Sequence, residues 1–424
     1  MPRRPLFPLL LALLLPSLLT AQPRAKLERA QREFATGNYP AAVRTLAAAG
    51  RLDGEGALLL AVSRFHAGDL LQAEADLLSL GEAENEPLSW FYLGRVYHAQ
   101  HRFDRAAVEY KRYLRSLGGG DGPERNTVID LLRNVDNGIR AGYVSEEMIA
   151  ENLGPETNGE FDEYAPIPSP TTGARLYFSV VRPRPGEQQP QSDIVFSQSQ
   201  GGGWGPPTDL NPLVNTNRHE SLVDISPDGR KLFYYRGDGA RDGNFLVDTF
   251  RAGGGAGQLV TLSLDAPIRP AGGDAAPFFG APDGIYFASD RPGGYGGLDL
   301  YCLPYRPGGG FGPAVNLGPN VNGPYDEVTP FLARDGNTLY FSTNDPDYSV
   351  GGFDVVRSFR IAGSNHQYIR PANAGMPLNS AGDDTHFRLA NDTFTGFLAS
   401  DRKDGLGRRD LYVIYYVEPR PEMR

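Results

Sequence analysis

Only one cysteine, Cys302, occurs among the 424 residues, so the chain cannot form an internal disulfide bond. Its flanks, DLYCLPY, alternate like a β-strand, which favours a buried, inert thiol over a nucleophile. Histidine is also scarce, with six residues. His98 and His101 share a helical segment without carboxylate or cysteine partners, and the others are scattered. This distribution predicts neither a metal site nor a cofactor.

A G-x-S-x-G elbow is missing as well, so no separate hydrolase domain of the prolyl-oligopeptidase type is expected. Long apolar runs are absent beyond the N-terminal segment, where Arg3 and Arg4 precede LFPLLLALLLPSLL and Ala21 offers a small residue for cleavage. This pattern is typical of a secretory signal peptide, predicted over residues 1–21. A membrane anchor is the alternative, which the short, proline-interrupted run disfavours. Because Cys302 lies far from this segment, a lipid-modified N-terminus is not expected.

Basic residues are too few for an electrostatic nucleic-acid surface. Lys and Arg number 41 against 51 Asp and Glu, a net charge of −10, and removal of Arg3 and Arg4 with the signal peptide makes it −12. Wholesale binding of nucleic acid is therefore excluded. Glycine (52) and proline (35) are plentiful, and aromatic residues are spread between them, as in all-β proteins with many tight turns. We expect an acidic protein exported to the periplasm.

The first part of the mature chain has a helical pattern, from about residue 27 to 117. Residues 90–110 contain W-x2-L-G-x2-Y followed by A-x3-aromatic, the spacing of tetratricopeptide (TPR) repeats. Ala42, Ala73 and Ala106 mark three copies, 31 and 33 residues apart. We therefore predict a TPR α-solenoid over residues 22–118. A capping helix and a linker are predicted to follow over residues 119–145.

A second repeat begins after this helical part. The strand-like pieces RLYFSV, KLFYYR, GIYFAS, TLYFST and TGFLAS recur at intervals of 56, 53, 54 and 58 residues. Such a period with several short strands per copy predicts a β-propeller with one four-stranded blade per repeat. Asp-Gly pairs at 228–229, 283–284 and 335–336 suit hairpin turns between the first two strands. The expected fold is thus a helical solenoid followed by a five-bladed β-propeller over residues 146–417.

The last repeat lacks a fourth strand. Residues 149–163, IAENLGPETNGEFDE, resemble residues 313–327, PAVNLGPNVNGPYDE, which form a fourth strand and the crossing to the next blade. We therefore predict that the segment near 147–153 pairs beside Asp410–Tyr416 and closes the ring, which removes an exposed edge. Residues 418–424 are left as a tail.

The repeat, with SPDG, LYF, SDR, GGYGG and DLY in this order and NLG between copies, resembles the TolB-type, WD-like propeller repeats of bacterial envelope proteins. A signal peptide, a TPR stack and this propeller look like the front half of the OmpA-family proteins of Bacteroidota, some of which belong to type IX secretion. The resemblance implies a periplasmic scaffold, associated with the outer membrane through partners. The chain departs from the family by lacking its carboxypeptidase-regulatory-like and peptidoglycan-binding OmpA-like domains, so cell-wall anchoring is not implied.

Loops between second and third strands share one propeller face with the crossings between blades. The face is predicted to gather Asp290, Arg291, Asp326, Glu327, Asp383, Asp384, Asp401 and Arg402. Recurring Asp and Arg residues fit inter-blade ion pairs and turn caps, a polar rim that docks a protein segment or a glycan, or a catalytic carboxylate pair. As a binding hypothesis, we assign these eight residues to a partner-binding rim.

Asp299, Asp354 and Asp410 occupy equivalent places at the start of the third strand, after glycine-containing loops such as SDRPGGYGGLD. Carboxylates at these places can accept hydrogen bonds from loop amides that no strand partner satisfies. A cation site and a partner contact are the alternatives for them.

Together these patterns predict a non-enzymatic scaffold or adaptor outside the cytoplasm. Its partners would be other envelope proteins, bound through the TPR and propeller surfaces in secretion or outer-membrane assembly. One alternative is a propeller that binds a glycan or a peptidoglycan fragment. A second alternative is a hydrolase that uses the rim carboxylates.

Overall fold

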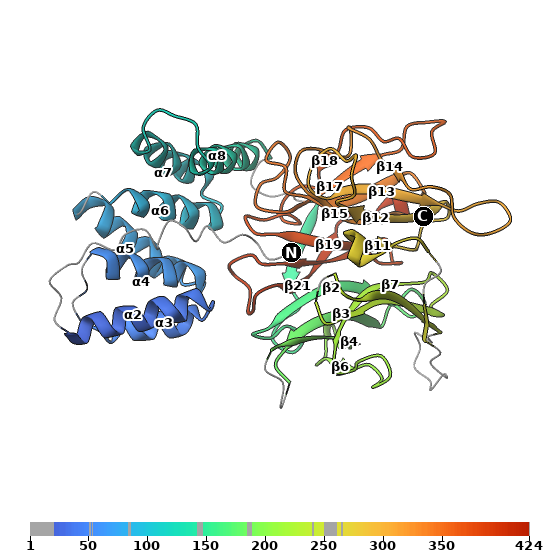
Figure 1. Cartoon of the computed structure of the whole chain (residues 1–424), viewed down its shortest axis with the longest axis horizontal. Coiled ribbons are helices and arrows are strands. Elements are labelled where there is room, and N and C mark those ends of the chain that lie inside the picture. The colour runs from blue at the N-terminus through green and yellow to red at the C-terminus, as the bar shows by residue number, and fades with distance from the viewer. Residues whose placement is uncertain are drawn as a thin grey trace. The chain divides into compact units, whose positions relative to one another are not determined.

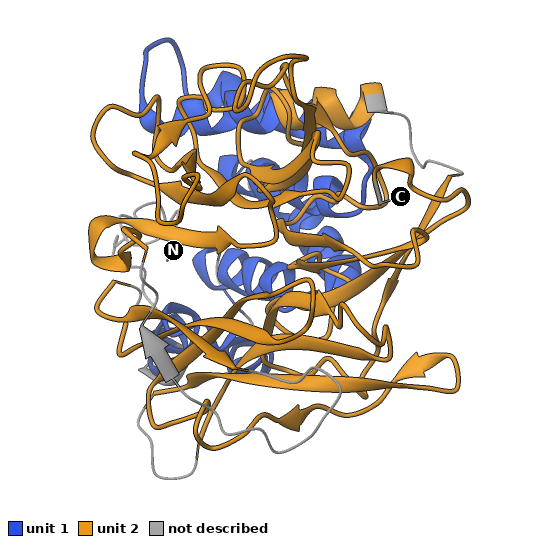
Figure 2. Ribbon diagram, turned by 90° about the vertical axis from the view of Figure 1, so that its right-hand side faces the viewer, with its two compact units in different colours: residues 1–132 blue, residues 133–424 orange. Residues whose placement is uncertain are grey.

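A computed structural model of the chain describes residues 21–50, 52, 54–83, 86–141, 147–184, 189–239, 241–249, 261–263 and 266–423. The chain divides into two compact units, residues 1–132 and 133–424, which Figure 2 colours separately. The predicted signal peptide lies outside the described residues except for Ala21. The end of the predicted linker, residues 142–145, and residue 146 of the predicted propeller also lie outside them. No helix among the described residues is long and apolar enough to cross a membrane.

Seven helices occupy the described N-terminal region (Figure 1). They are α2 (Ala21–Ala35), α3 (Tyr39–Ala47), α4 (Gly54–His66), α5 (Leu70–Ala83), α6 (Pro87–Ala99), α7 (Phe103–Ser116) and α8 (Pro123–Ala141). Consecutive helices from α2 to α7 pack against each other, so the chain forms a series of helical hairpins. The boundary between the two units falls inside α8.

Small residues let the helices of a hairpin approach closely. A Cβ atom at Gly94 of α6 would lie 2.6 Å from the Tyr110 ring of α7, and Tyr110 is fully buried. Ala42, Ala73 and Ala106 are also fully buried, as their predicted equivalence requires. Seven helices in sequence are compatible with a helical-repeat stack, and the TPR solenoid itself stays a prediction.

Five sheets form a five-bladed β-propeller, as the repeats predict. Blade I contains β2 (Asp162–Pro168), β3 (Arg175–Arg182), β4 (Gln191–Gln200), β5 (Gly203–Trp204) and β6 (Thr208–Asp209), and both short strands pair with β4. Blade II contains β7 (His219–Ile225), β8 (Lys231–Gly237), β9 (Asn244–Thr249) and β10 (Thr261–Ser263). Blade III contains β11 (Asp274–Phe278), β12 (Gly284–Ser289), β13 (Asp299–Pro304) and β14 (Val315–Asn316).

The last two blades show how the ring closes. Blade IV contains β15 (Glu327–Leu332), β16 (Thr338–Thr343), β17 (Asp354–Phe359) and β18 (Ala372–Asn373). Blade V contains β19 (Asp384–Leu389), β20 (Thr395–Ser400), β21 (Asp410–Tyr416) and, as its outer strand, β1 (Met148–Asn152). The pairing of β1 with β21 is antiparallel and runs from Met148 opposite Tyr416 to Asn152 opposite Tyr412. This is the pairing that the sequence predicts, and it joins the two ends of the propeller.

The first strand of each blade lines the centre of the ring, where β2, β7, β11, β15 and β19 contact their neighbours in turn. Each of these strands shifts register once against the second strand of its blade. In four of them a residue other than glycine takes a positive φ at the shift, namely Ala165, Ala276, Thr329 and His386. Bulges of this kind bend a strand, and here they recur at equivalent points around the axis.

The apolar core lies between adjacent sheets. One buried cluster joins blades III, IV and V, and smaller clusters join blades I and V, I and II, and II and III. Cys302 of β13 belongs to the largest cluster, and its side chain is fully buried. Burial raises the pKa of this thiol to about 12, so it stays protonated and unreactive at neutral pH, as predicted.

Candidate functional site

An aspartate begins the third strand of blades III, IV and V and accepts hydrogen bonds from the loop that precedes it. Asp299 accepts hydrogen bonds from the backbone amides of Tyr295 and Gly296, at 2.8 and 3.1 Å. Equivalent pairs of amides donate to Asp354 and Asp410, at 2.6 to 3.0 Å. All three carboxylates are at most 1% exposed. The prediction that they cap the loops is therefore confirmed, and these side chains are unavailable to a partner.

An asparagine from each outer strand completes the same cap. Asn316 donates to Asp299 at 2.7 Å, Asn373 to Asp354 at 2.8 Å, and Asn152 to Asp410 at 2.7 Å. Asn152 lies on β1, so the closing strand supplies to blade V the contact that a fourth strand supplies to blades III and IV. The similarity of the two NLG phrases thus has a structural cause.

Every blade also carries a buried acid at the start of its first strand. These acids are Glu163, Glu220, Asp274, Glu327 and Asp384. Each accepts a hydrogen bond from a backbone amide of the preceding crossing, at 2.6 to 3.3 Å. The shared task of the five acids is therefore to hold the crossing between blades.

Arginines neutralise three of the five acids. Arg236 pairs with Glu220 at 2.9 Å in blade II, Arg291 with Asp274 at 2.7 Å in blade III, and Arg402 with Asp384 at 2.7 Å in blade V. Glu163 and Glu327 form no ion pair among the described residues. Burial is the main reason that the pKa of each is raised to about 8.

Asp345 explains the difference in blade IV. Arg291 and Arg402 lie two residues after Ser289 and Ser400, which face the acids across the hairpin. In blade IV the facing residue is Thr343, and Asp345 stands two residues later. Asp345 raises the pKa of Glu327 further, after burial and Asp299.

Most of the eight predicted rim residues form ion pairs or hydrogen bonds within the propeller. Arg291, Glu327, Asp384 and Arg402 belong to the acid positions just described. The other four are Asp290, paired with Arg241 at 2.6 Å, and Asp326, Asp383 and Asp401, which accept backbone hydrogen bonds at 2.7 to 3.0 Å. Among the eight, only Asp290 is exposed. Their role in partner binding stays a prediction.

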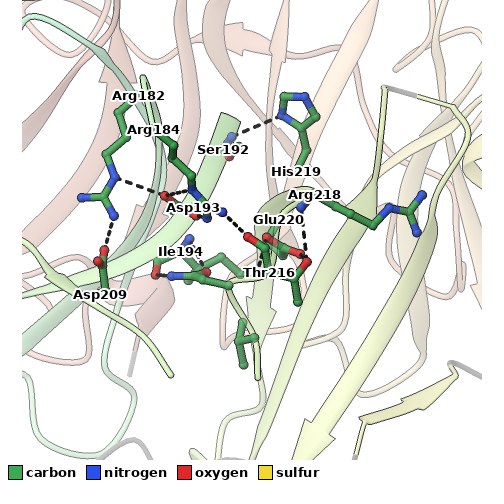
Figure 3. Close-up of polar contacts among 12 residues, drawn as sticks. Arg182, Arg184, Ser192, Asp193, Ile194, Asp209, Thr216, Arg218, His219 and Glu220 are labelled. Atoms are coloured by element: carbon green, nitrogen blue, oxygen red, sulfur yellow. Dashed lines mark hydrogen bonds and ion pairs between the residues drawn. The ribbon is translucent and has the colours of Figure 1, made fainter. Parts of the chain in front are cut away.

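Blades I and II build a different polar cluster, shown in Figure 3. Asp193 is the third residue of the third strand, β4, and its partners are arginines. Arg182 and Arg184 each donate through Nε to Asp193, at 3.1 Å, and Arg182 also reaches Asp209. Because Asp193 is 1% exposed and paired with two arginines, this cluster does not offer a free carboxylate.

A groove of about 410 Å³ opens on the loop face between blades III and IV. We call it the III–IV groove. Its walls include Tyr295, Tyr325, Tyr348, Arg133, Arg370, Asp345 and Asp347. Tyr295 comes from the glycine-rich loop of blade III and is 51% exposed. Tyr325 lies on the crossing to blade IV, and Tyr348 on the corresponding loop of blade IV.

The second half of α8 borders the same loop of blade IV. Asn137 donates to the carbonyl oxygens of Pro346 and Ser349, both at 2.9 Å, and Asn134 donates to the carbonyl of Gly351. These contacts hold Arg133 at the groove. None of the eight predicted rim residues lines the groove. The missed signal was a tyrosine in the loop or crossing phrases GGYGG, GPYDE and DPDYS.

Among the described residues, no group of three or more His, Cys, Asp and Glu side chains could hold a metal ion. His386 lies near the centre of the ring against the Tyr164 ring, with ring centroids 5.8 Å apart. Burial holds the pKa of His386 well below its usual value, and Arg409 and Arg388 lower it further. The sites that the structure does offer are therefore built from hydrogen-bonding and aromatic side chains.

No family model and no curated protein sequence matches this chain. A BT0996 complex with RGII is similar over 69% of this chain and 97% of the BT0996 structure, at 9% identity and a TM-score of 0.46. A glycoside hydrolase is similar over 68% and 96%, at 8% identity and a TM-score of 0.44. TolB from Acinetobacter baumannii is similar over 72% of each protein, at 12% identity and a TM-score of 0.32. At these identities the likeness shows the propeller fold alone.

The prediction that the chain is not an enzyme is contradicted by these neighbours. Most are propeller enzymes, since a periplasmic gluconolactonase and a sialidase join the glycoside hydrolase. The prediction was drawn from the missing hydrolase domain, but a propeller can itself carry an active site. The neighbours assign no reaction to this chain.

Proposed function

We propose that this chain is an extracytoplasmic scaffold that binds a segment of another envelope protein in the III–IV groove. The observation that supports this most is the lining of the groove, where three tyrosines and two arginines meet on a loop face. Tyrosine and arginine are the residues most enriched at the energetic centres of protein interfaces. Their rings and guanidinium groups bury large area while still forming hydrogen bonds.

The III–IV groove is open to solvent, so an extended segment of a partner protein could lie along it. Its walls come from three loops, one crossing and the middle of α8, so a bound segment could contact five parts of the chain at once. Asp347 and Arg370 are exposed on the walls and place charges of opposite sign beside Tyr348. Such charges select partners by complementarity and contribute less to affinity than the aromatic contacts do.

The wider setting is part of the proposal. A signal peptide and a TPR stack would place the scaffold in the periplasm, with the helical part as a second binding surface. The resemblance to OmpA-family and type IX proteins suggests outer-membrane assembly or secretion as the process. A glycan-binding loop face and a hydrolase that uses the rim acids remain alternatives, without a separate observation in their favour.

Site-specific photo-crosslinking in the native cells tests the proposal. A photoreactive amino acid replaces Tyr295 in the groove, and in the control it replaces Tyr415, which is 37% exposed on blade V. We expect one envelope protein to crosslink from position 295 and not from 415. The same protein, once purified, should bind wild type and lose at least about tenfold in affinity to the Tyr348→Ala variant, a factor typical of an interface hot spot.

Two outcomes would overturn the proposal. One is identical crosslinking from both positions, which would mean contact without a site. The other is a purified partner whose affinity does not change in the Tyr295→Ala and Tyr348→Ala variants. Circular dichroism of both variants shows whether the propeller is intact.

A further inference from the structure

A second hollow, of about 500 Å³, lies between the outer edge of blade III and the loop that follows β17 in blade IV. We call it the outer hollow. Residues 315–320 form one wall, and Ile361, Ser364, His366 and Gln367 line the other. Its volume falls within the range of small-molecule sites, which is about 300–1,000 Å³.

The described lining of the outer hollow carries no Asp, Glu, Lys or Arg side chain. This contrasts with the III–IV groove, which has two aspartates and two arginines. Burial keeps the pKa of His366 below its usual value, so its ring is neutral at pH 7. The hollow thus offers amide, hydroxyl and imidazole groups without a net charge, which suits a neutral ligand rich in hydrogen-bonding groups.

A cluster of buried polar atoms lies beside this lining. Arg360 donates to Asp283 Oδ2 at 2.7 Å and to the Tyr286 hydroxyl at 3.0 Å. The Tyr286 hydroxyl also bonds to that of Tyr368, at 3.1 Å. Tyr368 and His366 belong both to this cluster and to the lining of the hollow.

Three atoms of the cluster lack hydrogen-bond partners although they are buried. They are Asp283 Oδ1, Arg360 Nε and His366 Nδ1. The nearest approach of the imidazole to the carboxylate is 4.0 Å, between His366 Nδ1 and Asp283 Oδ2. All three atoms are closed to solvent, and neither Asp283 nor Arg360 lines the hollow. A ligand therefore contacts the wall that this cluster holds in place and not the cluster itself.

We infer that the outer hollow binds a neutral sugar residue, whose hydroxyl groups pair with the side chains of Gln367, Ser364, Asn320 and His366 in its lining. Hydroxyls both donate and accept, so they complement the amide, hydroxyl and imidazole groups of these side chains. Pro319 and Ile361 are exposed at the rim and provide an apolar surface for the C–H face of the ring. This inference does not depend on the III–IV groove.

Saturation-transfer NMR on the mature chain tests the inference, with a panel of neutral monosaccharides and disaccharides that includes N-acetylglucosamine and its β-1,4-linked dimer. We expect saturable binding by at least one of them. Gln367→Ala should weaken it about fivefold to tenfold, as the loss of one neutral hydrogen bond implies. His366→Phe should abolish it. Gln198→Ala is the matched control, because Gln198 is an exposed glutamine of β4 in blade I.

The inference fails if no sugar in the panel binds saturably, or if both hollow variants bind like wild type. Binding of uncharged peptides but no sugar would also overturn it and would mark the hollow as a peptide site. Gln367→Ala keeps the test valid if His366→Phe fails to fold, because the Gln367 side chain is exposed. Crosslinking from Tyr295 should be unchanged in both variants, which separates this site from the III–IV groove.

Discussion

Blades II, III and V differ from blades I and IV in one respect, although all five place an acid at the same point. In the first group an arginine neutralises the acid; in the second group no described basic residue does. All five acids still accept a backbone hydrogen bond from the preceding crossing. The comparison teaches that the fold requires the acceptor and not the charge. Where the arginine is missing, burial favours the protonated acid.

The largest effect is expected from removing an arginine where the acid depends on it. Arg402→Ala leaves Asp384, which is fully buried, without its cation. It also removes the hydrogen bonds to the carbonyls of Pro377 and Leu378. We expect a loss of about 3–5 kcal/mol in the free energy of unfolding, measured by urea denaturation. Arg408→Ala, at an exposed position of the same loop, should cost less than about 0.5 kcal/mol.

Equal losses of unfolding free energy in Arg402→Ala and Arg408→Ala would contradict this prediction, because they would show that Asp384 does not need its ion-pair partner. A shift of the denaturation slope in Arg402→Ala would instead report a change in the denatured or native ensemble. The midpoints are then compared only between variants with the same slope.

A smaller, pH-dependent effect is expected in blade IV. The pKa of Glu327 is about 8 in the folded chain, above its unfolded value of 4.5. Between these values the folded chain binds a proton that the unfolded chain has released. The contribution of protonated Glu327 to the free energy of unfolding is therefore fully present below pH 4.5 and is lost as the pH rises through 8. Glu327→Gln cannot lose a proton, so its stability relative to wild type should rise between pH 5 and pH 9, by on the order of 2–4 kcal/mol.

Glu220→Gln is the matched control for this titration. Glu220 occupies the same position in blade II and is paired with Arg236 at 2.9 Å. Its replacement should therefore lower the free energy of unfolding, without the rise relative to wild type that Glu327→Gln shows at high pH. A flat difference between Glu327→Gln and wild type across the pH range would contradict the proposed protonation. Other titrating groups are common to both proteins, so they cancel in the difference.

The smallest effect on stability is expected in the groove. The backbone amide of Tyr295 donates to Asp299 at 2.8 Å, whereas its side chain is 51% exposed. Tyr295→Ala should therefore change the melting temperature by no more than a typical surface substitution, about 0.5 kcal/mol in free energy. A large loss of stability would show that the Tyr295 side chain supports the propeller fold, and it would weaken the assignment of the groove as a binding site.

The propeller was predictable from the sequence because its repeats report the fold directly. Five aromatic strands gave the number of blades, and the shared NLG phrase located the closing strand β1. The ion pairs were not predictable in the same way. Asp290 and Arg291 are neighbours in sequence, yet Arg291 pairs with Asp274 of the preceding strand and Asp290 with Arg241 of blade II. Strand register and blade contacts decide such partners, and the sequence alone did not specify either.

The partner-binding rim stays a prediction, and the proposed III–IV groove was not predicted from the sequence. Sequence analysis chose charged residues, whereas the groove depends on tyrosines that reach it from loops of different blades. Tyr295 and Tyr348 lie on corresponding loops but four and six residues before the equivalent Asp299 and Asp354, and Tyr325 lies on a crossing, so the three share no common spacing. The outer hollow was missed for a related reason: Asp283, Arg360 and His366 meet only because two blades touch. The TPR assignment stays a prediction, compatible with the seven helices.

The pairing of β1 with β21 also has a consequence during biosynthesis. The two strands are separated by more than two hundred residues, so all of that intervening chain must be synthesised before Met148–Asn152 can pair with its neighbour. Until then that short strand stays without its sheet, and the nascent propeller is open to chaperones and proteases. We therefore expect cellular quality control to recognise chains in which β21 has not yet paired with β1, because this pairing closes the ring.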